Sequence, residues 1–234
     1  MTRSTITFRI RRFRPDQTDP PRIQDFGVPF KPQMTVLEAL ETIRLTQDPT
    51  LMYRRSCHHG SCGTCACMIN GAPALACTTQ ISRLEPDGVA LAPLDNLPCL
   101  GDLVVDTSGF FNALSPDWSN VRICETDSPV RRPDGVGRLM RLENCIECGC
   151  CTAVCPVVSS GSGFMGPAAL AALHNEMRNN PDTSNALLDL AAGKQGAGRC
   201  RRHIHCSRVC PSEVYPARRI AELQRAIAAS RQTR

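Results

Sequence analysis

The sequence predicts an α+β fold with a β-rich N-terminal half and a helical C-terminal half. Residues 5–10 alternate polar and apolar side chains, as a half-buried strand does. Residues 168–177, 184–192 and 216–230 instead combine high helix propensity with apolar side chains at helical spacing. The chain has 15 cysteines in 234 residues, and each half carries its own group of them. Each half is therefore expected to be built around its own cysteines.

The N-terminal half is expected to open with a hairpin of residues 5–10 and 23–30, followed by a helix. Thr35 and Glu38 have the spacing of a capping box, and the apolar residues after Thr35 share one helical face. A loop rich in small residues follows, then a strand at 66–69, a turn at 70–71 and a short strand at 103–105. This order of elements predicts a β-grasp unit over residues 1–106.

Four cysteines of this unit have the spacing C-x₄-C-x₂-C-x₁₁-C, namely Cys57, Cys62, Cys65 and Cys77. The first three match the plant-type pattern for a [2Fe–2S] cluster, whose fourth ligand lies further along the chain. Zinc is the alternative, but zinc sites usually pair one C-x₂-C with another, which this spacing does not do. The pattern favours [2Fe–2S].

Two further cysteine runs define the C-terminal half. Residues 145–156 read C-x₂-C-x₂-C-x₃-C-P, the bacterial-ferredoxin pattern in which the fourth cysteine binds a second cluster. Residues 200–211 keep that register with one change, His203 in place of the second cysteine. If the fourth ligands cross over, a [4Fe–4S] cluster takes Cys145, Cys148, Cys151 and Cys210. Three thiolates, those of Cys155, Cys200 and Cys206, then remain for a [3Fe–4S] cluster.

His203 leaves two interpretations open. It binds a fourth iron, or it covers the empty corner of the three-iron cluster, which we favour. Arg201 and His205 are expected to set the surroundings of the cluster, because nearby charges and hydrogen bonds tune its potential.

Four cysteines remain outside these sets. Cys150 breaks the ligand spacing and is expected to be a small buried residue, and Cys67 is expected to pack in the core. Cys99 and Cys124 fall in connecting segments. No nucleophilic or acid–base motif and no phosphate loop is recognisable, so we expect no catalytic residue and no substrate site on this chain.

Composition argues against several other classes of protein. The Arg-rich N-terminus is not followed by an apolar region, so we do not expect a secreted disulfide scaffold, and no run approaches the length of a membrane span. The formal charge of +5 would favour nucleic acid. Eleven thiolates around oxidised cluster cores bring that balance to roughly −1. No nucleic-acid partner is expected.

Three motifs in this order resemble the iron–sulfur subunit of succinate dehydrogenase and fumarate reductase. The resemblance also includes Arg54-Arg55-Ser56-Cys57, residues 69–71, 75–77 and 102–106, and Gly166-Pro167-Ala168. It implies a plant-type ferredoxin-like domain at 1–106, a connecting segment at 107–138 and a helical bacterial-ferredoxin-like domain at 139–234.

The family implies a linear electron path through three clusters. Electrons would pass between the FAD of a flavoprotein subunit, docked on the N-terminal half, and a quinone at a membrane-anchor subunit on the C-terminal half. The chain would be peripheral, on the cytoplasmic side of the cell membrane and held there by its partners. Alternatives are the iron–sulfur subunit of another flavoprotein oxidoreductase, or a free two-domain ferredoxin carrier.

The resemblance is weakest at the quinone end. Ubiquinone-using members usually have Trp residues shortly after the cysteine matching Cys155, and His directly after the one matching Cys200. Here these places hold Val158, Ser159, Ser160 and Arg201, and the single Trp is Trp118. The acceptor is then a menaquinone in a differently built site, or the anchor is of another type. The residues expected on the quinone side or around the cluster are Pro156, Ser160, Arg201 and His203.

Overall fold

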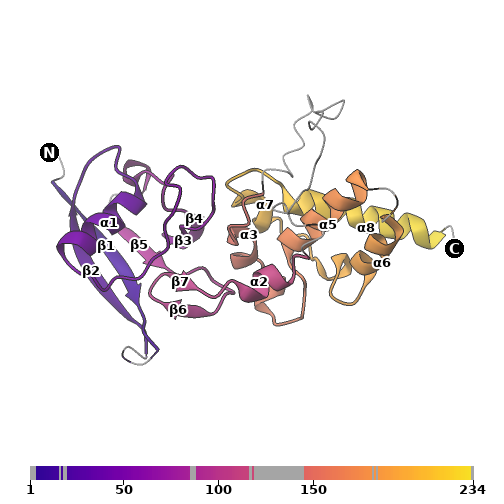
Figure 1. The fold of residues 1–234 in the computed structure, drawn as a ribbon, viewed down its shortest axis with the longest axis horizontal. Helices are drawn as coiled ribbons and strands as arrows, with labels where there is room; N and C mark the ends of the chain where they lie inside the picture. Colours follow the sequence, from indigo (N-terminus) through magenta and orange to yellow (C-terminus); the bar gives the residue numbers. More distant parts are fainter. Residues whose placement is uncertain are drawn as a thin grey trace, which may run out of the picture. The chain divides into compact units, whose positions relative to one another are not determined.

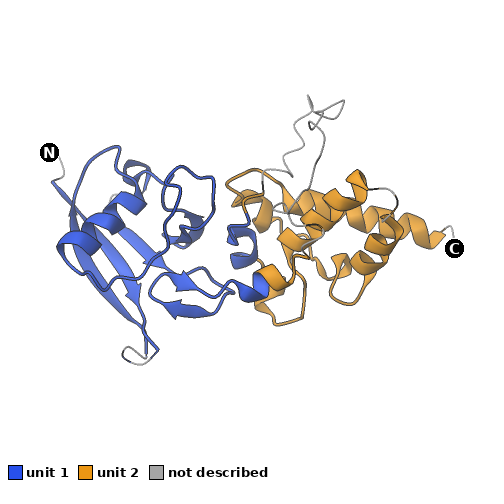
Figure 2. Cartoon of the chain, in the orientation of Figure 1, with its two compact units in different colours: residues 1–110, 147–154 blue, residues 111–146, 155–234 orange. Residues whose placement is uncertain are grey.

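The computed structural model describes residues 4–15, 17, 20–84, 88–115, 118, 145–180, 182 and 184–232. These fall into two compact units, residues 1–110 with 147–154, and residues 111–146 with 155–234 (Figure 2). Three of the sequence predictions fall outside the described residues: most of the connecting segment 107–138, the start of the C-terminal domain at residue 139, and Cys124. The sequence predicts residues 147–154 as part of the C-terminal domain, and in the structure they pack with the first compact unit.

The first unit is built on a five-stranded sheet with the order β2-β1-β5-β3-β4 (Figure 1). β1 (Thr5–Arg12) pairs antiparallel with β2 (Arg22–Pro29) and parallel with β5 (Val89–Ala92). β3 (Ala66–Ile69) pairs antiparallel with both β4 (Ala72–Leu75) and β5. β6 (Cys99–Gly101) and β7 (Val104–Val105) form a separate two-stranded sheet. The predicted strands at 5–10, 23–30 and 66–69 are confirmed, whereas β5 was not foreseen.

Helix α1 (Val36–Thr46) packs its apolar face into this unit. Thr35 Oγ1 accepts the Glu38 N–H at 3.2 Å, and Glu38 Oε2 accepts the Thr35 N–H at 2.7 Å, so the predicted capping box is confirmed. Val36, Leu37, Leu40 and Ile43 are buried, as are Ile6, Phe8 and Ile10 of β1. The short elements η1 (Ile81–Arg83) and α3 (Cys150–Ala153) complete the unit, and α2 (Ser108–Asn112) follows β7.

The second unit is helical. Its long helices are α5 (Pro167–Asn179), α6 (Ser184–Ala192) and α8 (Pro216–Gln232), and they pack on one another through a core that includes Leu170, Leu173 and Leu223. The short helices α4 (Pro156–Ser159), η4 (Ala197–Arg199) and α7 (His205–Arg208) carry the cysteine-rich segments. The predicted helices are confirmed. Within the described ranges, no helix is long and apolar enough to cross a membrane.

Candidate metal centres

The loop that carries Cys57, Cys62 and Cys65 directs backbone amides at sulfur atoms. The N–H groups of Ser61 and Cys62 donate to Cys57 Sγ at 3.3 and 3.4 Å, and the N–H of Cys77 donates to Cys65 Sγ at 3.4 Å. His58, Gly60 and Gly63 have φ angles of 62°, 78° and 69°, and this left-handed backbone curls the loop around its sulfur atoms. Such N–H···S bonds stabilise thiolates, the form that binds iron.

The cysteine thiols of this loop influence one another. The pKa of Cys57 is lowered to about 6, first by a backbone hydrogen bond at His59 and further by bonds from Cys62 and Ser61. The pKa of Cys65 is raised to about 12, mainly by burial and further by the neighbouring Cys77 and Cys62. Buried, crowded sulfur atoms of this kind become thiolates only with a cation among them, and an iron–sulfur core would supply it. The donor set therefore fits the predicted [2Fe–2S] cluster.

Two cysteines of the run at residues 145–156, Cys148 and Cys151, lie in the first unit. Cys148 directly precedes Gly149, whose φ of 80° starts the single turn of α3, and Cys151 lies within that turn. Asn96 Nδ2 donates to the carbonyl oxygens of Thr152 at 3.0 Å and Ala153 at 2.8 Å, which holds this turn against the loop after β5. Both cysteines are half-buried, whereas Cys150 between them is fully buried. The burial predicted for Cys150 is observed, and its exclusion from ligation stays a prediction.

Two further cysteines lie together in the second unit. Cys145 and Cys210 both pack against the buried pair Ala171 and Val214. The Val214 N–H donates to Cys210 Sγ at 3.3 Å, repeating the amide-to-sulfur contact of the first loop. Cys210 is thus presented as a thiolate ligand would be.

Three cysteines line one cavity of the second unit, namely Cys155, Cys200 and Cys206. The pKa of Cys206 is raised to about 11, mainly by burial and then by electrostatic interaction with the neighbouring Cys155 and Cys200. The Arg202 N–H donates to Cys200 Sγ at 3.4 Å. Three thiols lining one cavity, with an amide donor at one of them, suit an iron–sulfur cluster.

The residues predicted around this cluster divide into two groups. Pro156, Arg201 and His203 line the cavity, while Ser160 lies at the exposed end of α4 and is not among its lining residues. His203 and His205 lie with ring centroids 6.0 Å apart, and both are exposed. Throughout the described part of the chain, no group of three His, Cys, Asp or Glu side chains is placed to hold a single metal ion.

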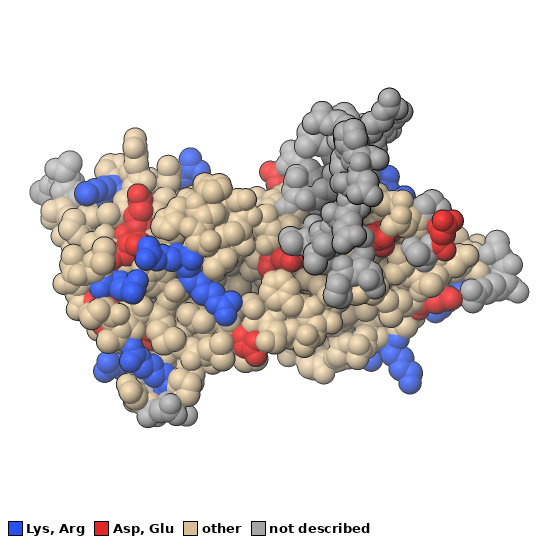
Figure 3. Space-filling view, viewed as in Figure 1, with Lys and Arg blue, Asp and Glu red and all other residues tan. Residues whose placement is uncertain are grey.

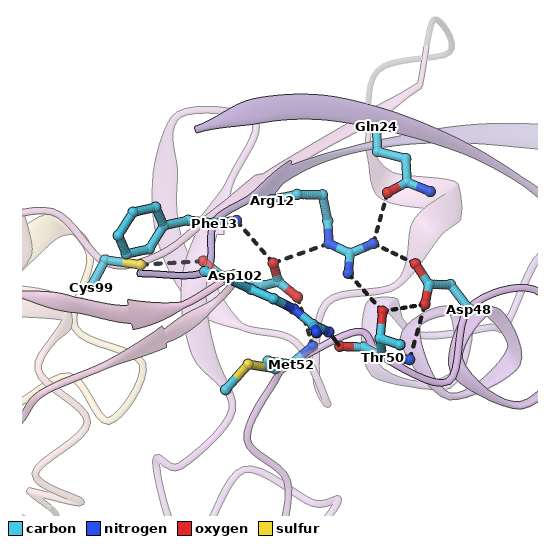
Figure 4. Close-up of polar contacts among 9 residues, drawn as sticks. Arg12, Phe13, Gln24, Asp48, Thr50, Met52, Cys99 and Asp102 are labelled. Carbon is cyan, nitrogen blue, oxygen red and sulfur yellow. Dashed lines mark hydrogen bonds and ion pairs between the residues drawn. The ribbon is translucent and has the colours of Figure 1, made fainter. Parts of the chain in front are cut away.

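A polar network that was not predicted from the sequence lies around Arg12 and Asp102 in the first unit. Asp102 accepts the N–H groups of Phe13 and Met52, both at 2.9 Å, and lies 3.0 Å from Arg12 Nε (Figure 4). Arg12 also contacts Asp48 at 2.6 Å and Gln24 at 2.8 Å. Cys99 Sγ donates to the Asp102 carbonyl at 3.6 Å, and Cys67 is buried in β3. The network joins the end of β1 to the segment that leads into the cysteine loop. No spacing rule in the sequence predicts it.

Comparison with known proteins identifies both units. Residues 7–112 match the family model described as a 2Fe-2S iron-sulfur cluster binding domain, and residues 141–214 match a 4Fe-4S dicluster domain. The fumarate reductase iron-sulfur subunit of Wolinella succinogenes is 31% identical, with 94% of this chain and 96% of that protein covered. The succinate dehydrogenase iron-sulfur subunit of Coxiella burnetii is 33% identical, with 94% and 95% covered. A chain of the Mycobacterium smegmatis Sdh1 complex in the apo form superposes with a TM-score of 0.79 at 25% identity, with 98% of each chain covered.

Proposed function

The chain belongs to the iron–sulfur subunits of succinate dehydrogenase and fumarate reductase, and from that premise we propose how its cysteines divide among three clusters. It is an electron-transfer subunit of an oxidoreductase complex, with a [2Fe–2S] domain and a dicluster domain. The [2Fe–2S] cluster is held by Cys57, Cys62, Cys65 and Cys77. The [4Fe–4S] cluster takes Cys145, Cys148, Cys151 and Cys210, and the [3Fe–4S] cluster takes Cys155, Cys200 and Cys206.

The observation that carries this assignment is the cavity lined by three thiols, with His203 where the repeated pattern would place a fourth. A four-iron cluster needs a ligand at each iron, and three thiolates satisfy a three-iron cluster. The exposed imidazole of His203 covers the remaining corner.

When bound, the clusters accept and release single electrons without binding substrate. The chain keeps water away from the clusters and tunes their reduction potentials. Burial of Cys65, Cys77 and Cys206 keeps water from the sulfur atoms, and the amide donors at Cys57, Cys65, Cys200 and Cys210 stabilise negative charge on them. Hydrogen bonds to sulfur favour the reduced, more negative state and raise the reduction potential.

The partners follow from the family. An FAD-containing flavoprotein subunit docks on the N-terminal unit, and membrane-anchor subunits with a quinone lie on the side of the three-iron cluster. The chain is held by these partners at the cytoplasmic face of the membrane. Pro156, Arg201 and His203 border the three-thiol cavity, which supports a role on the quinone side, whereas Ser160 has less support for it.

The test is to purify the complex through a tag on this chain. We expect a flavoprotein to co-purify, and succinate to reduce the clusters as followed by EPR. A preparation without flavin, or clusters that succinate leaves oxidised while dithionite reduces them, would contradict the proposal.

A further inference from the structure

Two buried thiols of the first unit belong to none of the proposed ligand sets. Cys150 lies in α3, two residues after Cys148 and directly before Cys151, and Cys67 lies in β3. Burial alone is ordinary for a free cysteine, which packs as a small apolar residue. The contacts of each thiol therefore decide whether it does more than fill space.

The contacts of Cys150 lead to a proposed ligand. Its side chain is hydrogen-bonded to the Cys148 side chain, and its backbone N–H donates to the same sulfur atom. Iron is bound by thiolates, which have no proton to donate. When Cys148 is a ligand, its sulfur is therefore the acceptor and the S–H of Cys150 is the donor.

The turn that carries this donor is fixed on the first unit by contacts that do not involve iron. A Cβ at Gly149 would lie 3.4 Å from Leu94 Cδ1 and 3.5 Å from Leu97 Cδ1, so α3 begins in close contact with the loop after β5. Asn96 holds two carbonyl groups of the turn, and α3 also packs against β4. The donor is therefore fixed in place, as an outer residue that acts on a metal ligand has to be.

Buried charge does not reach Cys150 in the described part of the first unit. Lys, Arg, Asp and Glu side chains of this unit appear on its surface in Figure 3, and its buried charges among the described residues are Arg12 and Asp102, which pair with each other. The electrostatic neighbours of Cys150 are other cysteines. A neutral hydrogen-bond donor is therefore the group placed to act on the sulfur.

We propose that Cys150 acts on the [4Fe–4S] cluster through Cys148, by donating its S–H to the ligand sulfur and so raising the reduction potential of that cluster. Reduction makes the cluster more negative, and a hydrogen bond to sulfur stabilises the more negative state. A higher potential favours the step in which the [2Fe–2S] cluster loses one electron and the [4Fe–4S] cluster gains it. The inference rests on the proposed function in taking Cys148 as a ligand, and it adds a residue that binds no iron.

The experiment is a redox titration of the purified complex, with each cluster followed by its EPR signal. Cys150→Ala removes the S–H and keeps the backbone N–H. We expect the equilibrium constant for reducing the [4Fe–4S] cluster to fall about fivefold, the worth of one neutral hydrogen bond. This is a shift of about 40 mV to lower potential, since a tenfold change for one electron is about 59 mV. The other two clusters should keep their potentials and serve as internal references.

Two further variants separate hydrogen bonding from packing. Cys150→Ser keeps a side-chain donor and should hold the potential close to that of the unchanged chain. Cys67→Ala is the matched control, because it removes a buried thiol whose electrostatic neighbour is Cys65, and it should leave the [4Fe–4S] potential unchanged. An unchanged potential in Cys150→Ala, or an equal shift in Cys67→Ala, would overturn the inference.

The same titration distinguishes failure of this inference from failure of the cluster assignment. If Cys150→Ala loses the four-iron signal, Cys150 is a ligand, and the assignment fails together with the inference. If the signal persists at an unchanged potential, the inference fails and the assignment of Cys148 stands.

Discussion

Arg12 Nε lies 3.0 Å from Asp102 Oδ1, and the two side chains are only 7% and 1% exposed. The pair connects the last residue of β1 to the turn between β6 and β7. Because Asp102 also accepts the N–H of Met52, it fixes the start of the segment that reaches Cys57 five residues later. The cluster loop thus depends on a buried charge pair that binds no iron.

Replacing Asp102 by Asn should destabilise the first unit by about 3–5 kcal/mol, the usual cost of breaking a buried ion pair. The amide keeps the shape and tolerates the φ of 41° at this position. The substitution removes one of the carboxylates that contact Arg12. It also turns the side-chain N–H of the asparagine toward another N–H donor. Loss of [2Fe–2S] absorbance on heating would report the change. Asp95→Asn, at an exposed position, is the control, and an equal effect there would count against this role for Asp102.

Acid should weaken the contact between Arg12 and Asp48. The pKa of Asp48 is lowered to about 2, first by the hydrogen bond from Arg12 and then by that from Thr50. A lowered pKa in the folded state adds stability above the usual value near 3.8, and this is lost as pH falls toward 2. The difference in denaturation midpoint between the unchanged chain and Asp48→Asn should therefore shrink from pH 5 toward pH 3. Loss of the clusters in acid is expected to affect both proteins equally. A difference in denaturation midpoint that does not change with pH would refute the lowered pKa of Asp48.

Substituting Gly60 should damage the [2Fe–2S] loop more than its φ angle alone explains. A Cβ at Gly60 would lie 2.9 Å from Thr78 Cγ2, whereas at Gly71, with a similar φ of 81°, it would meet nothing within 4 Å. Gly71→Ala should cost about 1–2 kcal/mol from the left-handed backbone. Gly60→Ala should cost more and lower the [2Fe–2S] content measured by visible circular dichroism. Equal losses would show that the close contact has no effect.

Cys148 and Cys150 should respond differently to the same change. Cys148→Ala removes a proposed ligand and should lower iron and acid-labile sulfide by a cluster's share. Cys150→Ala removes a fully buried thiol and should keep all clusters, with a stability loss of about 1 kcal/mol. Analysis of iron and sulfide per chain distinguishes them. Loss of a cluster in the Cys150 variant would make Cys150 a ligand.

Local patterns account for much of what the sequence predicted. Some patterns depend only on residues that are close in the sequence, such as the capping box at Thr35, the alternation in β1 and the cysteine spacings. The structure confirms the helix and the strand that they predicted, and the family matches confirm the cluster domains. The parallel pairing of β5 with β1 joins segments about 80 residues apart in the sequence. With four residues, Val89–Ala92 is too short to show the alternation of apolar and polar side chains that predicts a strand.

Long-range packing explains the remaining differences. Residues 147–154 belong to the first unit because Asn96 and the side chains around Leu94 hold α3 there, although the cysteine pattern continues into the second unit. The Arg12 network joins four separate segments. Asp102 falls in a segment that carries the family resemblance, but no local motif marks Arg12 or Asp48 or predicts their pairing.

The most direct test of the three-thiol site is EPR of the purified chain before and after the change His203→Cys. As isolated and oxidised, the unchanged chain should show the signal of a three-iron cluster. His203→Cys completes the C-x₂-C-x₂-C-x₃-C-P spacing, so that signal should disappear and a second four-iron signal should arise on reduction. A second four-iron signal already present in the unchanged chain, with no three-iron signal, would contradict the account and make His203 a ligand.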